Sequence, residues 1–335
     1  MITLTGFTCE AFEYILQKFS PVYHEFTPFV DPRGFIIRKI SKAGRPRLMQ
    51  AHDCLGLYLA WTRTRGSLMV LQLLFGVTFT AVAKYIQFAR RIVIDVLKKD
   101  EMAKIAIPSH DQLETYRALI ERRHPALPDV WGTMDGLKIK IDAAPDDITQ
   151  SRFYNGWKHC HFVTAVLCFA PDGTIPACYY NVPGCSHDST VAEWGRLYDK
   201  LEKVYEETGL KFVIDSAFCT TNIPFLIKSS QDDLTAGTGM LTFQEQVDDI
   251  ARKREATSMR QSAEWGMRAI QSSFPRLKDT LPYEEFGERK RIMTSLLLLF
   301  NLRARLVGIN QIRTVYMSHL DVDANLEFVH VYDRD

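Results

Sequence analysis

The chain has 335 residues, of which 46% are hydrophobic and 24% are charged, and its formal net charge is +1. This globular composition excludes collagen-like, coiled-coil and largely disordered proteins, and the length favours two domains or one large domain with an appendage. A net charge near zero neither favours nor excludes a nucleic-acid partner, because a DNA-binding protein can cluster its basic residues on one surface.

The cysteines and the apolar runs indicate the cellular compartment in which the protein is expected. The chain has seven cysteines, without a Cys-x-x-Cys pair, which is typical of reduced thiols in a cytosolic or nuclear protein. Histidines and cysteines gather between residues 159 and 185, but they lack the repeated short pairs of a zinc finger, so no zinc is expected. The apolar runs Leu296–Phe300 and Leu68–Ala83 are too short or too interrupted to cross a membrane, and we expect no membrane partner.

The first hundred residues have helical periodicity. A helix is predicted over Ala11–Phe19, and Pro21 should end it because proline cannot donate the helical hydrogen bond. A connector rich in proline, glycine and basic residues follows, from Pro28 to Arg47. Three further helices are predicted over Met49–Arg63, Ser67–Phe75 and Thr78–Lys99.

The last two of these helices form a helix–short turn–helix pattern. Gly76 suits the tight turn, and Thr78 can cap the following helix. The pattern predicts a DNA reader within about residues 49–100, and a plain helical hairpin with solvated basic residues explains it equally well. The candidate DNA contacts are Arg45, Arg47, Thr78, Lys84, Arg90 and Arg91.

The pattern changes after residue 108. A capping box at Ser109–Gln112 opens a helix that should end before His124. Strands are then predicted over Val130–Ile141, His161–Phe169 and Ile175–Asn181. A second capping box at Thr190–Glu193 should open a helix that ends near Gly209. The strand Lys211–Ile214 follows this helical crossover, so it should lie parallel to its neighbour, and the rest of the chain to Val307 is predicted to be helical.

Asp135 stands out among the acidic residues. It shares a strand face with Leu137, Ile139 and Ile141, which should be buried. An ionised carboxylate on such a face is costly unless it is paired or binds a cation. The alternative is an aspartate at the end of a strand, which accepts turn hydrogen bonds at Gly136.

Two further acids complete a candidate site. Asp215 follows the apolar run Phe212–Ile214, at the carboxyl end of a strand, where open α/β sheets place their sites; it could also cap the next helix. Glu264 lies on a predicted helix between Arg260 and Arg268, so a surface salt bridge is its alternative explanation. Two strand acids followed by a helix acid match the layout of an RNase H-like nuclease, in which carboxylates hold divalent metal ions.

Longer blocks of sequence surround these acids. They follow one another in order and comprise Trp131–Ile139, Phe153–Lys158, Asn181–Ser189, Val213–Phe218 and Arg260–Glu264, continued to Phe274–Leu277. Together they resemble the conserved blocks of PIF/Harbinger-type transposases, which are DDE-type endonucleases. The chain departs from that pattern in a longer, charged segment between Phe243 and Arg260, and in Val182, where an aromatic residue is frequent.

The resemblance implies an α/β architecture with an RNase H-like mixed sheet flanked by helices, preceded by an all-helical, helix-turn-helix-like region. It implies that Asp135, Asp215 and Glu264 are the catalytic residues and the ligands of two Mg²⁺ or Mn²⁺ ions, and that the protein cuts and joins DNA. The alternative is a transposase-derived DNA-binding or scaffolding protein that does not cut.

The resemblance also implies a domain order and partners. A helical region (1–107) should precede a nuclease domain (108–310) and a C-terminal tail (311–335). A nuclear location is expected, with a cytoplasmic pool as the alternative, together with a Myb-like protein partner and self-association.

Three other residues are candidate accessory groups. His187 and Asp188 could assist phosphate binding or orient a metal ligand, and a helix-capping Asp188 beside a structural His187 is at least as good an explanation. Lys158 could contact phosphate, or it could be a solvated charge at a strand edge.

Overall fold

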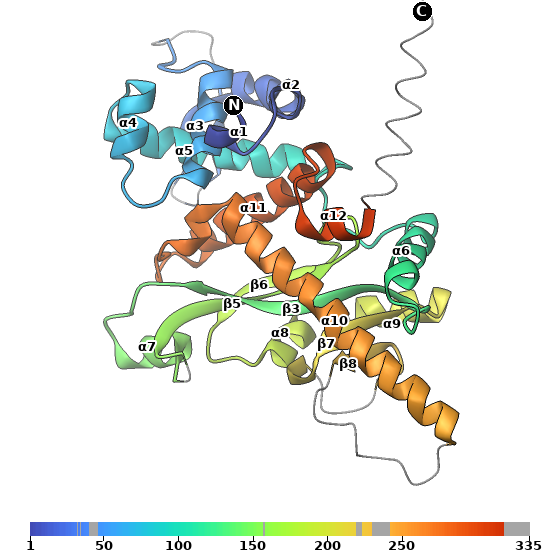
Figure 1. Cartoon of the computed structure of the whole chain (residues 1–335). Helices are drawn as coiled ribbons and strands as arrows, with labels where there is room; N and C mark the ends of the chain where they lie inside the picture. The colour runs from blue at the N-terminus through green and yellow to red at the C-terminus, as the bar shows by residue number, and fades with distance from the viewer. Residues whose placement is uncertain are drawn as a thin grey trace, which may run out of the picture. The chain divides into compact units, whose positions relative to one another are not determined.

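A computed structural model describes residues 1–31, 33, 35–39, 46–156, 158–218, 223–229 and 242–317 (Figure 1), without the side chains of residues 29, 30 and 243. These residues form two compact units. The helical unit comprises Met1–Lys104, Ile139–Gln150 and Ile270–Val307, and the sheet unit comprises Ile105–Lys138, Ser151–Ala269 and Gly308 onward. Arg45 and most of the predicted tail lie outside the described residues. The first change of unit lies close to the predicted boundary at residue 107, but later segments return to the helical unit.

The helical unit contains helices from both ends of the chain. Its helices are α1 (Ile2–Thr5), α2 (Cys9–Glu25), α3 (Ala51–Arg63), α4 (Met69–Phe75), α5 (Phe79–Leu97) and α11 (Phe286–Leu306), with a 3-10 turn at Pro275–Lys278. The strands β1 (Phe26–Val30) and β2 (Ile36–Arg38) pair antiparallel. Helix α2 continues through Pro21, so the predicted end was wrong. Phe19 and Tyr23 on either side of the proline are fully buried, and this packing offsets the lost backbone hydrogen bond.

The predicted α4–α5 pair is present. Gly76 adopts a left-handed conformation with φ 63°, and the Thr78 side chain accepts a hydrogen bond from the backbone N–H of Ala81 at 3.4 Å. The two helices lie at 90° to each other, an angle found in helix-turn-helix pairs. The exposed surface of α4 is apolar, with Leu73 81% exposed, so this helix offers no charge to a DNA backbone.

Helix α11 is the central helix of this unit. Its residues from Ile292 to Ala304 are buried, whereas Phe286 in the first turn is exposed. Tyr58 of α3 donates a hydrogen bond to the hydroxyl of Ser295 at 2.6 Å. The stretch Phe286–Met317 is long and apolar enough to cross a membrane by length and composition alone, but 67% of its most apolar window is buried within the structure. A core helix has the same properties.

The sheet unit has a mixed sheet in the order β4-β5-β3-β7-β8, with β6 also paired to β5. Strand β3 (Val130–Lys140) is parallel to β7 (Lys211–Asp215), and β7 is parallel to β8 (Leu226–Ser229). Strands β4 (Tyr154–Asn155) and β6 (Cys178–Pro183) are both antiparallel to β5 (Cys160–Phe169). This order is compatible with an RNase H-like fold. The predicted strands are confirmed, and β8 is one that the sequence pattern missed.

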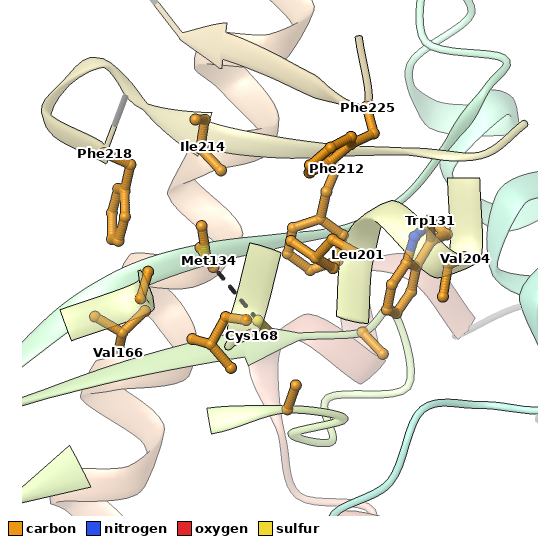
Figure 2. Packing of buried hydrophobic residues seen from close by; sticks show 14 of the residues in the cluster. Trp131, Met134, Val166, Cys168, Leu201, Val204, Phe212, Ile214, Phe218 and Phe225 are labelled. Atoms are coloured by element: carbon orange, nitrogen blue, oxygen red, sulfur yellow. Dashed lines mark hydrogen bonds between the residues drawn. The ribbon is translucent and has the colours of Figure 1, made fainter. Parts of the chain in front are cut away.

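Both faces of the sheet are covered. On one face, Met134, Phe212 and Ile214 pack against apolar residues of α6 (His110–Arg123), α8 (Asp188–Trp194) and α9 (Leu197–Thr208). Figure 2 shows Leu201 and Val204 of α9 beside Phe212 and Trp131. The opposite face is covered by α10 (Phe243–Ser273), which runs across the sheet in Figure 1. A side-chain carbon on Gly266 of α10 would lie 2.5 Å from the Phe169 ring, so glycine permits this close approach.

Helix boundaries in this unit differ in part from the prediction. The capping box at Ser109 is present, and Gly209 ends α9 with φ 73°. The predicted start at Thr190 was wrong, because α8 begins at Asp188 and is separated from α9 by Arg196 in a left-handed conformation. Helix α10 begins at Phe243, where Thr242 and Glu245 exchange hydrogen bonds, so the charged segment is the first part of the helix that carries Glu264.

Candidate active site

Asp135 and Asp215 end adjacent parallel stretches of β3 and β7. Met134 and Ile214 are directly paired in the parallel register, and each chain continues by one residue to its aspartate. The side chains of residues that occupy equivalent positions on neighbouring parallel strands lie side by side. The predicted parallel arrangement is therefore confirmed, and it brings two widely separated acids together.

Asp135 occupies the more buried position. Its Oδ1 accepts a hydrogen bond from the backbone N–H of Gly136 at 2.7 Å. Burial raises the pKa of Asp135 to about 6, and the negative charges of Asp215 and Asp188 act in the same direction. The Gly136 hydrogen bond and the positive charge of Arg260 lower this pKa, but by less. Burial thus disfavours the ionised form of Asp135, and a bound cation would stabilise that form.

Glu264 is connected to the strand acids through Arg260. The Nη2 atom of Arg260 lies 3.3 Å from Oε1 of Glu264, one turn along α10, and its Nη1 atom lies 3.6 Å from Oδ2 of Asp215. The sequence allowed a simple surface pair within the helix, but the structure extends that pair to β7. Arg268, on the opposite side of Glu264 in sequence, is exposed.

Asp188 is a fourth acid of this region. Its carboxylate lies directly against Gly136, where an added side-chain carbon would be 2.3 Å from Oδ2 of Asp188. Burial raises the pKa of Asp188, and the nearby charges of Lys138 and His187 oppose that rise. Asp188 is the first residue of α8, whereas His187 precedes the helix, is exposed and makes no side-chain cap hydrogen bond. Glycine at position 136 therefore permits the approach of Asp188.

The other candidate residues lie in different surroundings. Lys158 is an exposed turn residue whose backbone N–H donates to Oδ1 of Asn155 at 3.0 Å. In the helical unit, Lys84 is exposed on α5 and Arg91 is partly buried. The guanidinium of Arg47 donates hydrogen bonds to the backbone carbonyls of Tyr23, His24 and Phe26. Its donors are thus used within the chain, which does not suit a DNA contact.

Arg90 is the clearest departure from the expected DNA contacts. It is 3% exposed, forms an ion pair with Glu288 of α11, and lies over the ring of Trp61 at 4.7 Å. A residue in this position cannot reach a DNA backbone without unfolding the unit, so Arg90 is removed from the candidate contacts. The sequence pattern treated Arg90 as a DNA contact or a solvated basic residue, because it did not show the distant acid.

The acids provide suitable ligands for a hard divalent cation. Carboxylate oxygens are the preferred ligands of Mg²⁺ and Mn²⁺. The Arg260 guanidinium bridges Asp215 and Glu264, which indicates that this pair of carboxylates accepts a cation between them. Among the described residues, no group of three His, Cys, Asp or Glu side chains is close enough to hold a metal ion as they stand, so Arg260 and the acids would rearrange on metal binding. The six cysteines described are free thiols.

A family model described as DDE superfamily endonuclease matches residues 134–301, just over half of the 335-residue chain. The chain belongs to this endonuclease family. The match includes Asp135, Asp215 and Glu264. No curated protein and no solved structure matches the chain. DDE endonucleases generally use divalent metals and act on DNA, which agrees with the chemistry of the carboxylates described above.

The position of Arg260 between two carboxylates leads to a testable prediction about the metal affinity of this DDE endonuclease. Arg260→Gln should bind Mn²⁺ about tenfold more tightly, because removing a charge within about 4 Å of two carboxylates changes the interaction energy by about 1 kcal/mol or more. Calorimetric titration with Mn²⁺ measures this change. Arg268→Gln removes the same charge from the exposed side of α10 and should leave the affinity unchanged. Equal or weaker binding by Arg260→Gln would contradict the prediction.

Proposed function

We propose that this protein is a divalent-metal-dependent DNA endonuclease of the PIF/Harbinger transposase type. Asp135, Asp215 and Glu264 are its catalytic residues and metal ligands, and two Mg²⁺ or Mn²⁺ ions are its cofactors. The observation that carries the proposal is the parallel register that sets Asp135 beside Asp215, with Glu264 linked to the same point through Arg260.

The residues of the proposed site have different roles. The two strand carboxylates would hold the metal ions, and Glu264 would complete the ligands from α10. Bound metal would activate a water molecule or a 3′-hydroxyl and stabilise the leaving oxygen. Asp188, whose carboxylate lies against Gly136, would position the middle of β3 next to Asp135. His187 and Lys158 are exposed and could reach phosphate from outside the acids.

The test is metal-dependent cleavage of DNA. The full-length protein is incubated with supercoiled plasmid, and with duplexes that end in inverted repeats, in Mg²⁺, Mn²⁺ or EDTA. We expect nicked or linear products only with metal, and their loss in Asp135→Asn, Asp215→Asn and Glu264→Gln. Glu207→Gln removes an exposed acid of α9 and should cut like the unmodified protein.

The same assay separates the alternative function. A transposase-derived protein that only binds DNA would retain DNA in a mobility-shift assay, would leave it intact with every metal, and would bind equally well after replacement of the acids. That combination of results would overturn the nuclease proposal. A preference for RNA or damaged duplex would instead redefine the substrate of the same site.

The resemblance to PIF/Harbinger transposases supports three further parts of the proposal. The protein acts in the nucleus, with a cytoplasmic pool before import, and a Myb-like partner contributes DNA binding or import. It also self-associates on DNA. Thr78, Lys84 and Arg91, on the α4–α5 pair, are the DNA contacts that we retain for the helical unit.

A further inference from the structure

A charged cavity in the helical unit lies apart from the carboxylates of the active site in sequence and shares no residue with them. Its volume is about 530 Å³. It lies between α5, which contributes Gln87, Arg90 and Arg91, and the first turn of α11, which contributes Phe286–Glu288 and, one turn later, Arg291. All of these residues belong to the same compact unit.

Most of the acids around the cavity already have partners. Glu288 accepts a hydrogen bond from Arg90 with one oxygen, and its other oxygen lies 2.8 Å from Nε of Arg291. Asp31 accepts from the backbone N–H of Phe35 at 2.8 Å and lies 3.6 Å from Arg33. Glu284 accepts from the Tyr283 hydroxyl. Each of these three carboxylates therefore already interacts with a donor, and the charge of the fourth acid, Glu285, acts on Arg291.

Two guanidinium donors at the cavity, in contrast, have no hydrogen-bond partner within the part of the chain that the structure describes. Among the described residues, Nη2 of Arg91 and Nε of Arg90 are buried and have no hydrogen-bond partner. Burial and the positive charges of Arg291 and Arg90 together lower the pKa of Arg91 to about 10, although Asp95 and Asp31 act in the opposite direction. A buried donor without a partner is costly, and an acceptor supplied by a ligand would relieve that cost.

The start of α11 adds to this donor surface. The helix has 21 residues, and its N-cap residue, Glu285, makes no side-chain cap hydrogen bond. The first N–H groups of a helix favour anions. Gly287 has no side chain to cover them, and a carbon added there would lie 3.3 Å from Nη1 of Arg291. The guanidinium of Arg291 thus lies beside the exposed first turn.

We propose that this cavity binds a phosphate group, held by Arg91, Arg291 and the N-terminus of α11. Guanidinium groups form paired, charge-assisted hydrogen bonds with phosphate oxygens, and phosphate offers enough oxygens for both arginines and the helix. An anion fits better than a metal cation because, among the described residues, the buried atoms without a partner at this cavity are donors. The phosphate belongs either to a DNA backbone or to a free phosphate compound.

The test is binding of inorganic phosphate and pyrophosphate to the full-length protein by calorimetry, with a short duplex DNA as a separate arm. Arg91→Gln and Arg291→Gln should each weaken phosphate binding at least tenfold. Lys98→Gln, an equal change of charge at the exposed end of α5, should leave it unchanged. Asp135→Asn should also bind phosphate normally, so failure of the nuclease proposal and failure of this one give different results.

The DNA arm identifies the source of the phosphate. If Arg91→Gln weakens the binding of both duplex and phosphate, and phosphate competes with DNA, the site binds the DNA backbone. If the substitution weakens only phosphate binding, the ligand of the site is a free phosphate compound. Circular dichroism checks the fold, and Arg91→Lys, which keeps the charge without the planar fork, should also bind more weakly. Absence of phosphate binding, or unchanged binding in Arg91→Gln and Arg91→Lys, would overturn the proposal.

Discussion

Asp135→Asn is expected to reduce metal-dependent DNA cleavage by about 10³-fold or more, because it removes a ligand and the charge that holds the cation. The same substitution should stabilise the metal-free protein near neutral pH. Most substitutions of buried residues destabilise a fold, so the two results together would mark Asp135 as a residue kept for chemistry at a cost to stability.

The expected gain in stability of Asp135→Asn follows from the raised pKa of Asp135. Burial raises the pKa of Asp135 from the ordinary 3.8 to about 6 in the folded state. Below about pH 4 the carboxyl is protonated in both states and has no effect. Between pH 4 and 6 only the unfolded state ionises, so stability falls as pH rises, and above pH 6 the full penalty applies. At about 1.4 kcal/mol per pKa unit the penalty is at most about 3 kcal/mol, and solvent screening reduces it.

Urea unfolding in EDTA measures this effect. The free energy of unfolding of Asp135→Asn should exceed that of the unmodified protein by about 1–3 kcal/mol at pH 7.5, and the difference should be small at pH 4. Asp129→Asn is the matched control, since Asp129 lies 2.9 Å from Lys211 and 2.7 Å from Arg252 and should lose stability at pH 7.5. A destabilised Asp135→Asn at both pH values would show that the carboxylate serves the fold instead.

A second large effect is expected at His124, where acid should loosen the sheet unit. His124 is 4% exposed, and its Nε2 lies 3.1 Å from the Tyr316 hydroxyl, which is 3.0 Å from Oγ of Ser262. Burial lowers the pKa of His124 from 6.5 to about 4, and the charge of Arg123 acts in the same direction. The unfolded state therefore binds more protons between pH 6.5 and 4, and stability falls as pH falls through that window.

The full cost below pH 4 is about 3 kcal/mol. His124→Gln keeps a hydrogen-bonding group but cannot titrate, so it should lose less stability than the unmodified protein between pH 7 and pH 4, by about 2 kcal/mol. The comparison is made in the Asp135→Asn background, which removes the opposite titration. His110→Gln alters an exposed histidine of α6 and should leave the pH dependence unchanged. Equal acid sensitivity in His124→Gln would contradict the prediction.

Local signals in the sequence were sufficient for much of the sheet unit. Alternating apolar residues predicted β3, and the apolar run before Asp215 predicted β7. The helical crossover ahead of that run predicted the parallel pairing, which the structure confirms. The capping box at Ser109 and the turn at Gly76 were likewise readable, because they depend on residues close together in the chain. Of these features, β3 and β7 determine where Asp135 and Asp215 lie.

Features that depend on distant partners were not readable. Helix α2 continues through Pro21 because Tyr23 packs in the core and donates to the carbonyl of Met49. Arg90 is buried because Glu288 lies on α11, far away in sequence. The carboxylate of Asp188 lies against Gly136 because the start of α8 meets the middle of β3. Side-chain periodicity cannot show such pairings, because it reports only on neighbours along the chain and these partners meet only in the folded structure.

Helix α10 carries two anchors at a fixed interval. Arg252 pairs with Asp129 near the start of β3, and Arg260 pairs with Asp215 at the end of β7. The separation of the two arginines along the helix corresponds to about two turns, or roughly 12 Å. An insertion of one residue between them would rotate Glu264 by about 100° away from the strand acids while the first anchor stayed docked. The interval from Arg252 to Glu264 therefore determines which side of α10 carries Glu264 towards the strand acids.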